Sequence, residues 1–254
     1  MSKFELKRIL ITVKTYPTPA SKGAEVVCTA GITEDGQWIR IFPVPFRYLS
    51  GEQQFHKYQW IEAKVKKSSD SRIESYEVDA DSIQVIGDPL STRNGWLERK
   101  KLVEPLRTPS LCHLKSMRKK NRNTLGLIKP KVIHNFYVEK DRLDWTPAEK
   151  AKLLQYSIFE GKTLNPLEKI PYKFSYSFTC DDPRCTGHRL ICTDWEIGAA
   201  YRRWSKQYGD GWYKTILNRF QTDMILKYDT SFFVGTIHGH PGTWIIIGLY
   251  YPPH

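Results

Sequence analysis

The first third of the chain alternates apolar and polar residues with the two-residue period of β-strands. Turn signals separate these runs, among them an Asp-Gly pair in Glu34–Gln37, and no long helical pattern intervenes. Short strands with this spacing predict a small barrel or sandwich. The expected strands are residues 8–13, 24–32, 38–44, 58–67 and 82–87.

The middle of the chain changes to a helical period. Ser110 is a plausible N-cap, and Leu111, Leu114 and Met117 recur at the spacing of an apolar helix stripe. The next run, residues 125–140, predicts two strands broken at Pro130. Thr146–Glu149 then has the pattern of a capping box and predicts the start of a short helix.

The last third predicts a mixture of strands and helices. Tyr172–Thr179 alternates strictly between aromatic and other residues, so it predicts a strand, and residues 188–195 predict a returning strand. Helices are expected at 195–208 and 211–228. Two apolar runs around His240-Pro-Gly predict a C-terminal hairpin.

Potential metal ligands crowd the turn between the two strands of this last third. Cys180, Cys185, His188 and Cys192 are spaced C-x4-C-x2-H-x3-C, and structural zinc favours four such ligands in a tetrahedron. In a strand, His188 and Cys192 would lie about 13 Å apart, so Cys192 needs a bend to join. Otherwise Cys28, Cys112, a second histidine or water supplies the fourth ligand.

Two alternatives to a zinc site stay open. The spacing C-x4-C-x2 opens the ligand pattern of plant-type iron–sulfur ferredoxins, although histidine stands at the third position here. The other alternative is a set of buried free thiols, since cysteine is among the most buried residue types. A metal held in a turn between strands is expected to be structural rather than catalytic.

Basic charge is concentrated in one segment of the chain. The net charge is +12, and Leu90–His134 holds twelve Lys and Arg against two Glu, a balance of +10. Such localised charge is typical of polyanion binders, whereas the alternative is a solvated face. Four basic residues of the expected helix fall in one stripe and are candidates for phosphate contacts: Lys115, Arg118, Lys119 and Arg122.

Trp38 and Arg40 are candidates for contacts with bases. At positions i and i+2 of the expected strand they share one face, opposite Ile39 and Ile41, which should belong to the core. Arg40 is therefore expected to face solvent or a ligand. Aromatic rings stack on bases while arginine and lysine follow phosphates.

Other classes of protein receive less support. We see no P-loop, dinucleotide fingerprint, nucleophile elbow or HExxH motif. A metal-dependent nuclease could be assembled from Asp194, Glu196, Asp223, Asp229, His238 and His240, but Asp194 and Glu196 equally suit a helix start. No apolar run has the length of a membrane-spanning helix, and the odd number of cysteines argues against a secreted disulfide framework, so we expect a cytoplasmic protein.

Short motifs in the N-terminal half are similar to those of proteins with a dual OB-fold domain. They are RILITVK at Arg8–Lys14, VVCTAGITEDGQWIRIFP at Val26–Pro43, and LGLIKP at Leu125–Pro130. The resemblance covers about residues 6–140 and implies two small barrels that bind nucleic acid, in bacterial proteins associated with conflict against phage or mobile elements. It marks Cys28 and Arg40 as characteristic positions. The insertion TYPTPASKGAE at Thr15–Glu25 departs from the family pattern.

Together these patterns predict an α+β protein with an OB-like nucleic-acid-binding region at residues 1–145 and a metal-stapled α+β region at 146–254. The expected partner is DNA or RNA, and the expected cofactor is zinc, with an iron–sulfur cluster as the alternative. Two other functions remain open: a metal-dependent nuclease or hydrolase acting on nucleic acid, and an interaction subunit that docks an acidic protein partner.

Overall fold

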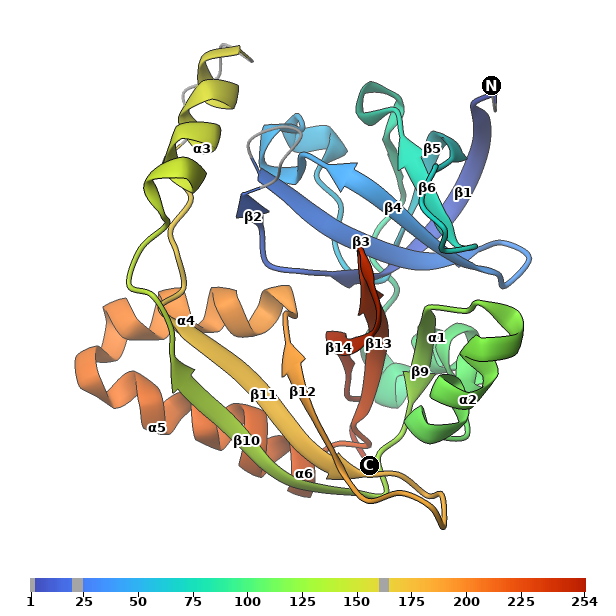
Figure 1. Cartoon of the computed structure of the whole chain (residues 1–254), viewed down its shortest axis with the longest axis vertical. Helices are drawn as coiled ribbons and strands as arrows, with labels where there is room; N and C mark the ends of the chain where they lie inside the picture. Colours follow the sequence, from blue (N-terminus) through green and yellow to red (C-terminus); the bar gives the residue numbers. More distant parts are fainter. Residues whose placement is uncertain (1–2, 20–24, 160–164) are drawn as a thin grey trace. The chain divides into compact units, whose positions relative to one another are not determined.

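The chain folds into two compact units in the computed structural model (Figure 1). The structure describes residues 3–19, 25–159 and 165–254, without the side chains of 119, 121, 155–159 and 241. Unit 1 comprises residues 1–71, 75–89 and 141–171, and unit 2 comprises residues 72–74, 90–140 and 172–254.

Unit 1 is built on a closed five-stranded barrel. Its strands are β1 (Glu5–Lys14), β3 (Glu25–Thr33), β4 (Trp38–Val44), β5 (Gln59–Lys67) and β6 (Ser75–Val78). Each strand pairs with the next in the order β1-β3-β4-β6-β5, and β5 pairs again with β1 to close the barrel. The β4–β6 pair is parallel and the others are antiparallel. Among five strands this order is that of an OB-fold barrel.

The α+β class and the OB-like barrel predicted from sequence are therefore confirmed, and the barrel's core follows the apolar pattern. Ile9, Ile11, Ile61 and Val65 are fully buried. Smaller elements complete the unit: β2 (Thr18–Pro19), β7 (Gln84–Ile86), three 3-10 turns (Phe46–Tyr48, Gly51–Gln53 and Ala80–Ser82) and helix α3 (Pro147–Phe159). Part of the Thr15–Glu25 insertion, residues 20–24, lies outside the described residues.

Gly31, within the Cys-x-Ala-Gly-Ile motif, allows β1 and β3 to approach closely. It pairs with Ile11, and a Cβ atom there would overlap the Leu10 carbonyl, coming within 2.9 Å of its carbon. We expect Gly31→Ala to lower the free energy of unfolding by about 1 to 3 kcal/mol, because the strands must separate. Thermal unfolding should show this, whereas Gly51→Ala, whose Cβ meets nothing within 4 Å, should have little effect.

Unit 2 contains an open seven-stranded sheet in the order β10-β11-β12-β14-β13-β9-β8. The strands are β8 (Arg107–Thr108), β9 (Leu125–Ile128), β10 (Val132–Lys140), β11 (Tyr172–Thr179), β12 (His188–Cys192), β13 (Ser231–Ile237) and β14 (His240–Tyr250). The helices are α1 (Arg93–Val103), α2 (Leu111–Asn121), α4 (Trp195–Tyr208), α5 (Trp212–Leu217) and α6 (Met224–Leu226). Short turns at Glu104–Leu106 and Gly209–Gly211 and a π-helix at Asn218–Asp223 connect them. Figure 1 shows α4, α5 and α6 running beside β10, β11 and β12, with α2 beside β9.

The residue ranges that form unit 2 concern two expectations from the sequence: a second barrel and a domain boundary after residue 145. Residues 90–140 pack with residues 172–254 into one sheet, whereas the resemblance implied a second barrel within residues 6–140. Across the described part of that range, the strands after β7 join the open sheet instead. The domain boundary between residues 145 and 146 stays a prediction.

Candidate metal centre and basic helix

Four potential metal ligands converge at one end of the unit 2 sheet. Cys112 lies in the first turn of α2, Cys180 follows β11, Cys185 lies in the β11–β12 turn, and His188 opens β12. One ligand atom from each lies within 4.8 Å of every other. The antiparallel pairing of β11 with β12 sets His188 opposite Phe178, so the turn between them folds back on itself. Gly187 adopts a φ of +98°, which favours glycine.

The spacing of these atoms suits a single tetrahedral ion. The Nε2 atom of His188 is 3.3 Å from Cys112 Sγ and 3.4 Å from Cys185 Sγ. In a tetrahedral zinc site, the usual Zn–S and Zn–N lengths place sulfur and nitrogen about 3.6 Å apart. The residues present therefore fit a metal ion such as zinc. In contrast, a two-iron cluster spreads its ligands over two irons.

Backbone N–H groups already point at two of the sulfurs. The Leu111 N–H donates to Cys180 Sγ at 3.3 Å, and the Cys180 N–H donates to Cys185 Sγ at 3.2 Å. Leu111 begins helix α2, whose N-cap Ser110 accepts from His113 N–H as predicted. Such donors stabilise thiolates, and partners of this kind orient the ligands around a metal.

The thiols of this cluster differ in pKa. Burial, with the neighbouring Cys185 and Cys180, raises the pKa of Cys112 to about 11. Burial raises the pKa of Cys185, but hydrogen bonds from the backbone N–H groups of Cys180 and Gly187 and with the thiols of Cys112 and Cys180 together lower that pKa overall. Burial and the nearby Lys115 charge lower the pKa of His188, which favours the neutral imidazole that ligation requires. Metal uptake should therefore release protons, since only thiolates coordinate.

The fourth potential ligand in this group is Cys112, one of the alternatives considered from the sequence, whereas Cys192 lies outside the group. Cys192 lies at the far end of β12, opposite Phe174, four residues beyond His188. The strand stays extended instead of bending, so about 13 Å separates these two positions. Cys28 belongs to β3 in the unit 1 barrel. The sequence names Cys112 only as one of several alternatives, because its contact with the turn depends on how α2 packs.

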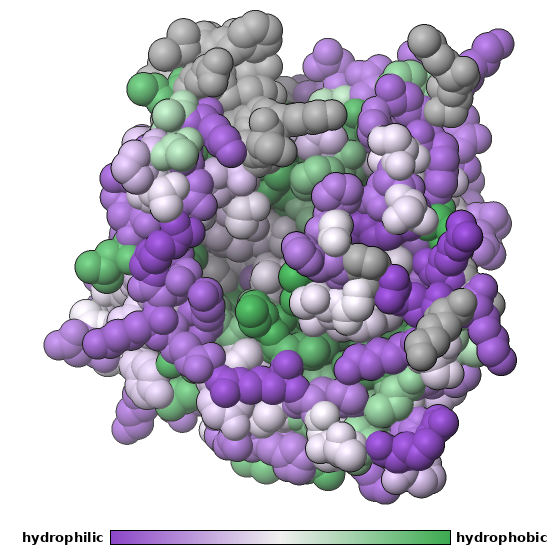
Figure 2. All heavy atoms as spheres, viewed as in Figure 1, coloured by the Kyte–Doolittle hydropathy of each residue, from purple (hydrophilic) through white to green (hydrophobic). Residues whose placement is uncertain are grey.

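Helix α2 also carries the predicted basic stripe. Lys115 and Arg122 are exposed and Arg118 is half-buried, and no ion pair within the described residues involves any of the three. The side chain of Lys119 lies outside the described residues. Arg122 forms the left-handed C-cap of the helix, with a φ of +57°. Hydrophilic side chains gather over the region of α2 (Figure 2). The same helix therefore presents unpaired positive charge and one metal ligand.

Family models cover nearly the whole chain in two parts. Residues 107–254, more than half of the chain, match the model described as "Domain of unknown function (DUF8757)". The chain belongs to the DUF8757 family. Residues 5–105 match a second model, "Domain of unknown function (DUF8758)". The DUF8757 match contains all four converging ligands and all of α2.

Comparisons with individual proteins add little to this. No curated protein matches the chain in sequence. One solved structure, the "Crystal structure of the tetrameric p202 HIN2", aligns over 100% of this chain and 94% of its own chain at 9% identity, with a TM-score of 0.34. That likeness is too weak to support a conclusion about fold or function.

The DUF8758 part places Arg40, but not Trp38, differently from expectation. Ile39 and Ile41 are each 1% exposed, as predicted for core residues. Arg40 was expected to face solvent or a ligand; it does not face solvent, because it is only 2% exposed, and its contact with a ligand stays a prediction. Both faces of β4 are covered at residues 39–41, so alternation does not identify an outer face there. Trp38 is partly exposed at the start of the strand.

Acidic residues considered for a nuclease have structural partners in the DUF8757 part. Asp194 is 1% exposed and caps α4, accepting from Glu196 N–H at 2.7 Å and Leu249 N–H at 2.8 Å. Asp229 pairs with Arg107 and Lys129. The Cys112 group is the one convergence of three or more His, Cys, Asp or Glu side chains among the residues that the structure describes.

No helix in the described parts of the chain is both long enough and apolar enough to cross a membrane.

Proposed function

We propose that this protein binds nucleic acid through the basic face of α2, and that a structural zinc ion fixes α2 to the β11–β12 turn. The observation that carries the proposal is the position of Cys112. It contributes a sulfur to the cluster from the same helix that presents Lys115, Arg118 and Arg122. A metal bound there would hold the phosphate-binding side chains in place.

Zinc suits this cluster better than iron–sulfur chemistry. Three thiolates and one imidazole are a common set for structural zinc, which is four-coordinate and closed to substrate. All four ligand atoms are supplied by the protein, so no position is left for a reacting water. The ion would stabilise unit 2 and take no part in catalysis.

The binding energy would come mainly from phosphate contacts. The Leu90–His134 segment has a balance of +10, and release of counterions from a nucleic acid favours binding to such a surface. Labelled single-stranded DNA and RNA, titrated at several salt concentrations, test this. Binding that does not depend on salt would instead show that phosphate contacts do not supply most of the binding energy. Turnover of either strand with divalent metal would favour the nuclease alternative, and a role in phage or mobile-element conflict stays a prediction from the resemblance.

Trp38 remains the predicted stacking residue of the barrel. If bases stack there, Trp38→Ala should weaken single-strand binding by about 1 to 3 kcal/mol per base and leave the salt slope unchanged. A titration combined with a thermal melt measures both. The control is Phe4→Ala, which removes a ring that is 47% exposed on the same unit. Loss of stability without a separate loss of affinity would show that Trp38 only packs.

A further inference from the structure

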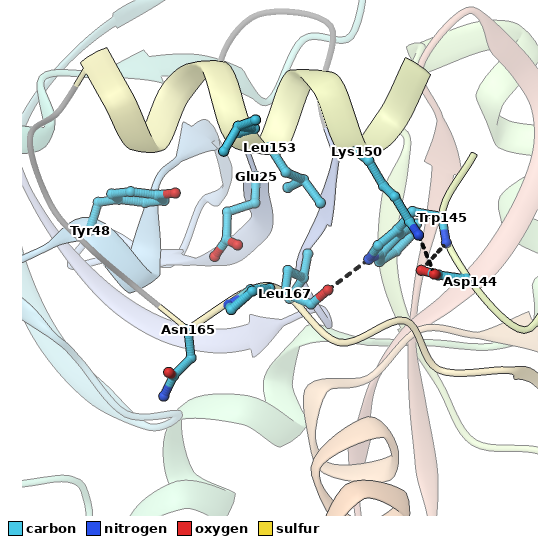
Figure 3. Close-up of a pocket in the computed structure, with 10 residues that line it drawn as sticks. Glu25, Tyr48, Asp144, Trp145, Lys150, Leu153, Asn165 and Leu167 are labelled. Carbon is cyan, nitrogen blue, oxygen red and sulfur yellow. Dashed lines mark hydrogen bonds and ion pairs between the residues drawn. The ribbon is translucent and has the colours of Figure 1, made fainter. Parts of the chain in front are cut away.

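A cavity of about 460 Å³ lies in unit 1 between helix α3 and the barrel (Figure 3). This volume is within the range of small-molecule sites, roughly 300 to 1,000 Å³. Its walls are mostly apolar and aromatic, with Tyr48, Trp145, Leu153 and Leu167 among them. In the view of Figure 3, Tyr48 and Trp145 lie on either side of Glu25. A planar, largely apolar molecule would fit such walls.

Glu25 gives the cavity a buried hydrogen-bond acceptor without a partner among the described residues. The residue is 3% exposed, and its Oε1 has no partner among the described residues. Its Oε2 accepts from Arg47 Nη1 at 2.8 Å, and Arg47 Nη2 donates to the Asn165 carbonyl. Burial raises the pKa of Glu25 although the Arg47 charge opposes this. A buried acceptor without a donor is costly, so a ligand that supplies a donor would be favoured.

The charged groups and the indole N–H at the cavity already have partners. Trp145 Nε1 donates to the Leu167 carbonyl at 2.8 Å, and Lys150 pairs with Asp144. The charge of Glu25 is balanced by Arg47. An additional cation or anion would therefore find no free counter-charge among these groups, which favours a neutral ligand.

We propose that this cavity binds a nucleobase bearing an amino group, which donates its N–H to Glu25 Oε1. Carboxylates accept from the amino group of cytosine in known recognition, and bases held in pockets stack on aromatic and apolar side chains. The base could belong to a free nucleoside or to a bound strand. The site is separate from α2, so it extends the proposed function without depending on the phosphate contacts made there.

The test compares cytidine with 3-methyluridine, whose base has no N–H. Calorimetric titration of the whole chain should show cytidine binding at least roughly tenfold more tightly than 3-methyluridine. In Glu25→Gln the order should reverse. Arg47 can only donate, so the amide oxygen must turn to Arg47, and the amide NH₂ then faces the cavity and donates to a base carbonyl.

Two further variants keep the test independent of folding. Leu154 lines the cavity and is 64% exposed, so Leu154→Trp should obstruct the cavity and weaken cytidine at least tenfold without disturbing the core. Leu143→Trp, at a residue 86% exposed and outside the cavity lining, is the matched control. Thermal melts of all variants confirm that each is folded.

A second binding experiment decides the source of the base. It compares the affinity for a short oligo-dC strand with the affinity for the same strand lacking one base. Free cytidine binding identifies a nucleoside as sufficient, while discrimination seen only between the strands identifies a base within bound nucleic acid. Equal binding of cytidine and 3-methyluridine, with no strand discrimination and no effect of Glu25→Gln, would overturn the proposal. The phosphate contacts of α2 are measured on different variants, so the proposed function can fail or hold separately.

Discussion

Replacing Cys112 or Cys185 with serine is expected to release the metal and to unfold the region around α2. Serine is a poor zinc ligand, because its hydroxyl does not ionise near neutral pH. Structural zinc contributes about 10 to 16 kcal/mol in small zinc-dependent peptides, and this binding energy is folding energy. Part of the unit 2 core should stay folded. A decrease of even about 4 kcal/mol in the free energy of unfolding nevertheless lowers Tm by roughly 10 °C.

Elemental analysis and thermal unfolding measure the two effects together. Wild-type protein should hold about one zinc per chain, and neither variant should hold any. Cys28→Ser is the matched control in unit 1, and Cys192→Ser decides the fourth ligand. If the geometry is right, Cys192→Ser keeps the metal. Metal loss in Cys192→Ser but not in Cys112→Ser would contradict the ligand set, and wild-type protein without metal would contradict the site. Visible absorbance would indicate iron–sulfur.

Local patterns in the sequence predict most of the elements of this fold. The strand Trp38–Val44, the strand Tyr172–Thr179 and the helix Trp195–Tyr208 have the bounds that their periodicity indicates. The capping box at Thr146–Glu149 is present, with Thr146 N–H donating to the Glu149 carboxylate at 2.7 Å. These features depend on neighbours within one or two turns, which is the range a single sequence reports on.

What the sequence did not predict depends on long-range packing. Strand β6 closes the barrel, yet Ser75–Val78 has only four residues and too few apolar positions to show a period. The sequence left Cys112 as one of several candidates for the fourth ligand, because Cys112 is 68 residues before Cys180 in the chain and meets it only through the packing of α2. The burial of Arg40 likewise follows from cover on both faces of β4.

The basic stripe on α2 leads to the second large expected effect, which concerns salt. Changing Lys115, Arg118 and Arg122 together to alanine should remove three phosphate contacts. Each contact contributes about 0.7 to 0.9 to the slope of log K against log salt, so the slope should fall by about 2 to 3. Binding of labelled DNA or RNA at several salt concentrations measures the slope. Affinity near physiological salt should fall at least roughly tenfold.

A matched variant separates the location of charge from its amount. Lys64, Lys140 and Lys152 are exposed and have no ion pair within the described residues. Changing these three to alanine removes the same charge from elements other than α2. If the stripe binds phosphates, this control keeps nearly the wild-type slope of log K against log salt. Equal slopes for the two triple variants would show that the basic residues of α2 are solvated and do not contact phosphates.

The metal and the basic stripe can then be connected experimentally. The triple variant on α2 keeps Cys112, so it should retain its zinc and its Tm while it loses affinity. Cys112→Ser keeps every basic side chain, but should lose zinc, stability and affinity together, because α2 is no longer fixed to the β11–β12 turn. If Cys112→Ser loses zinc but binds nucleic acid with the wild-type slope, the metal does not position the helix. The zinc ion would then stabilise the fold without contributing to binding.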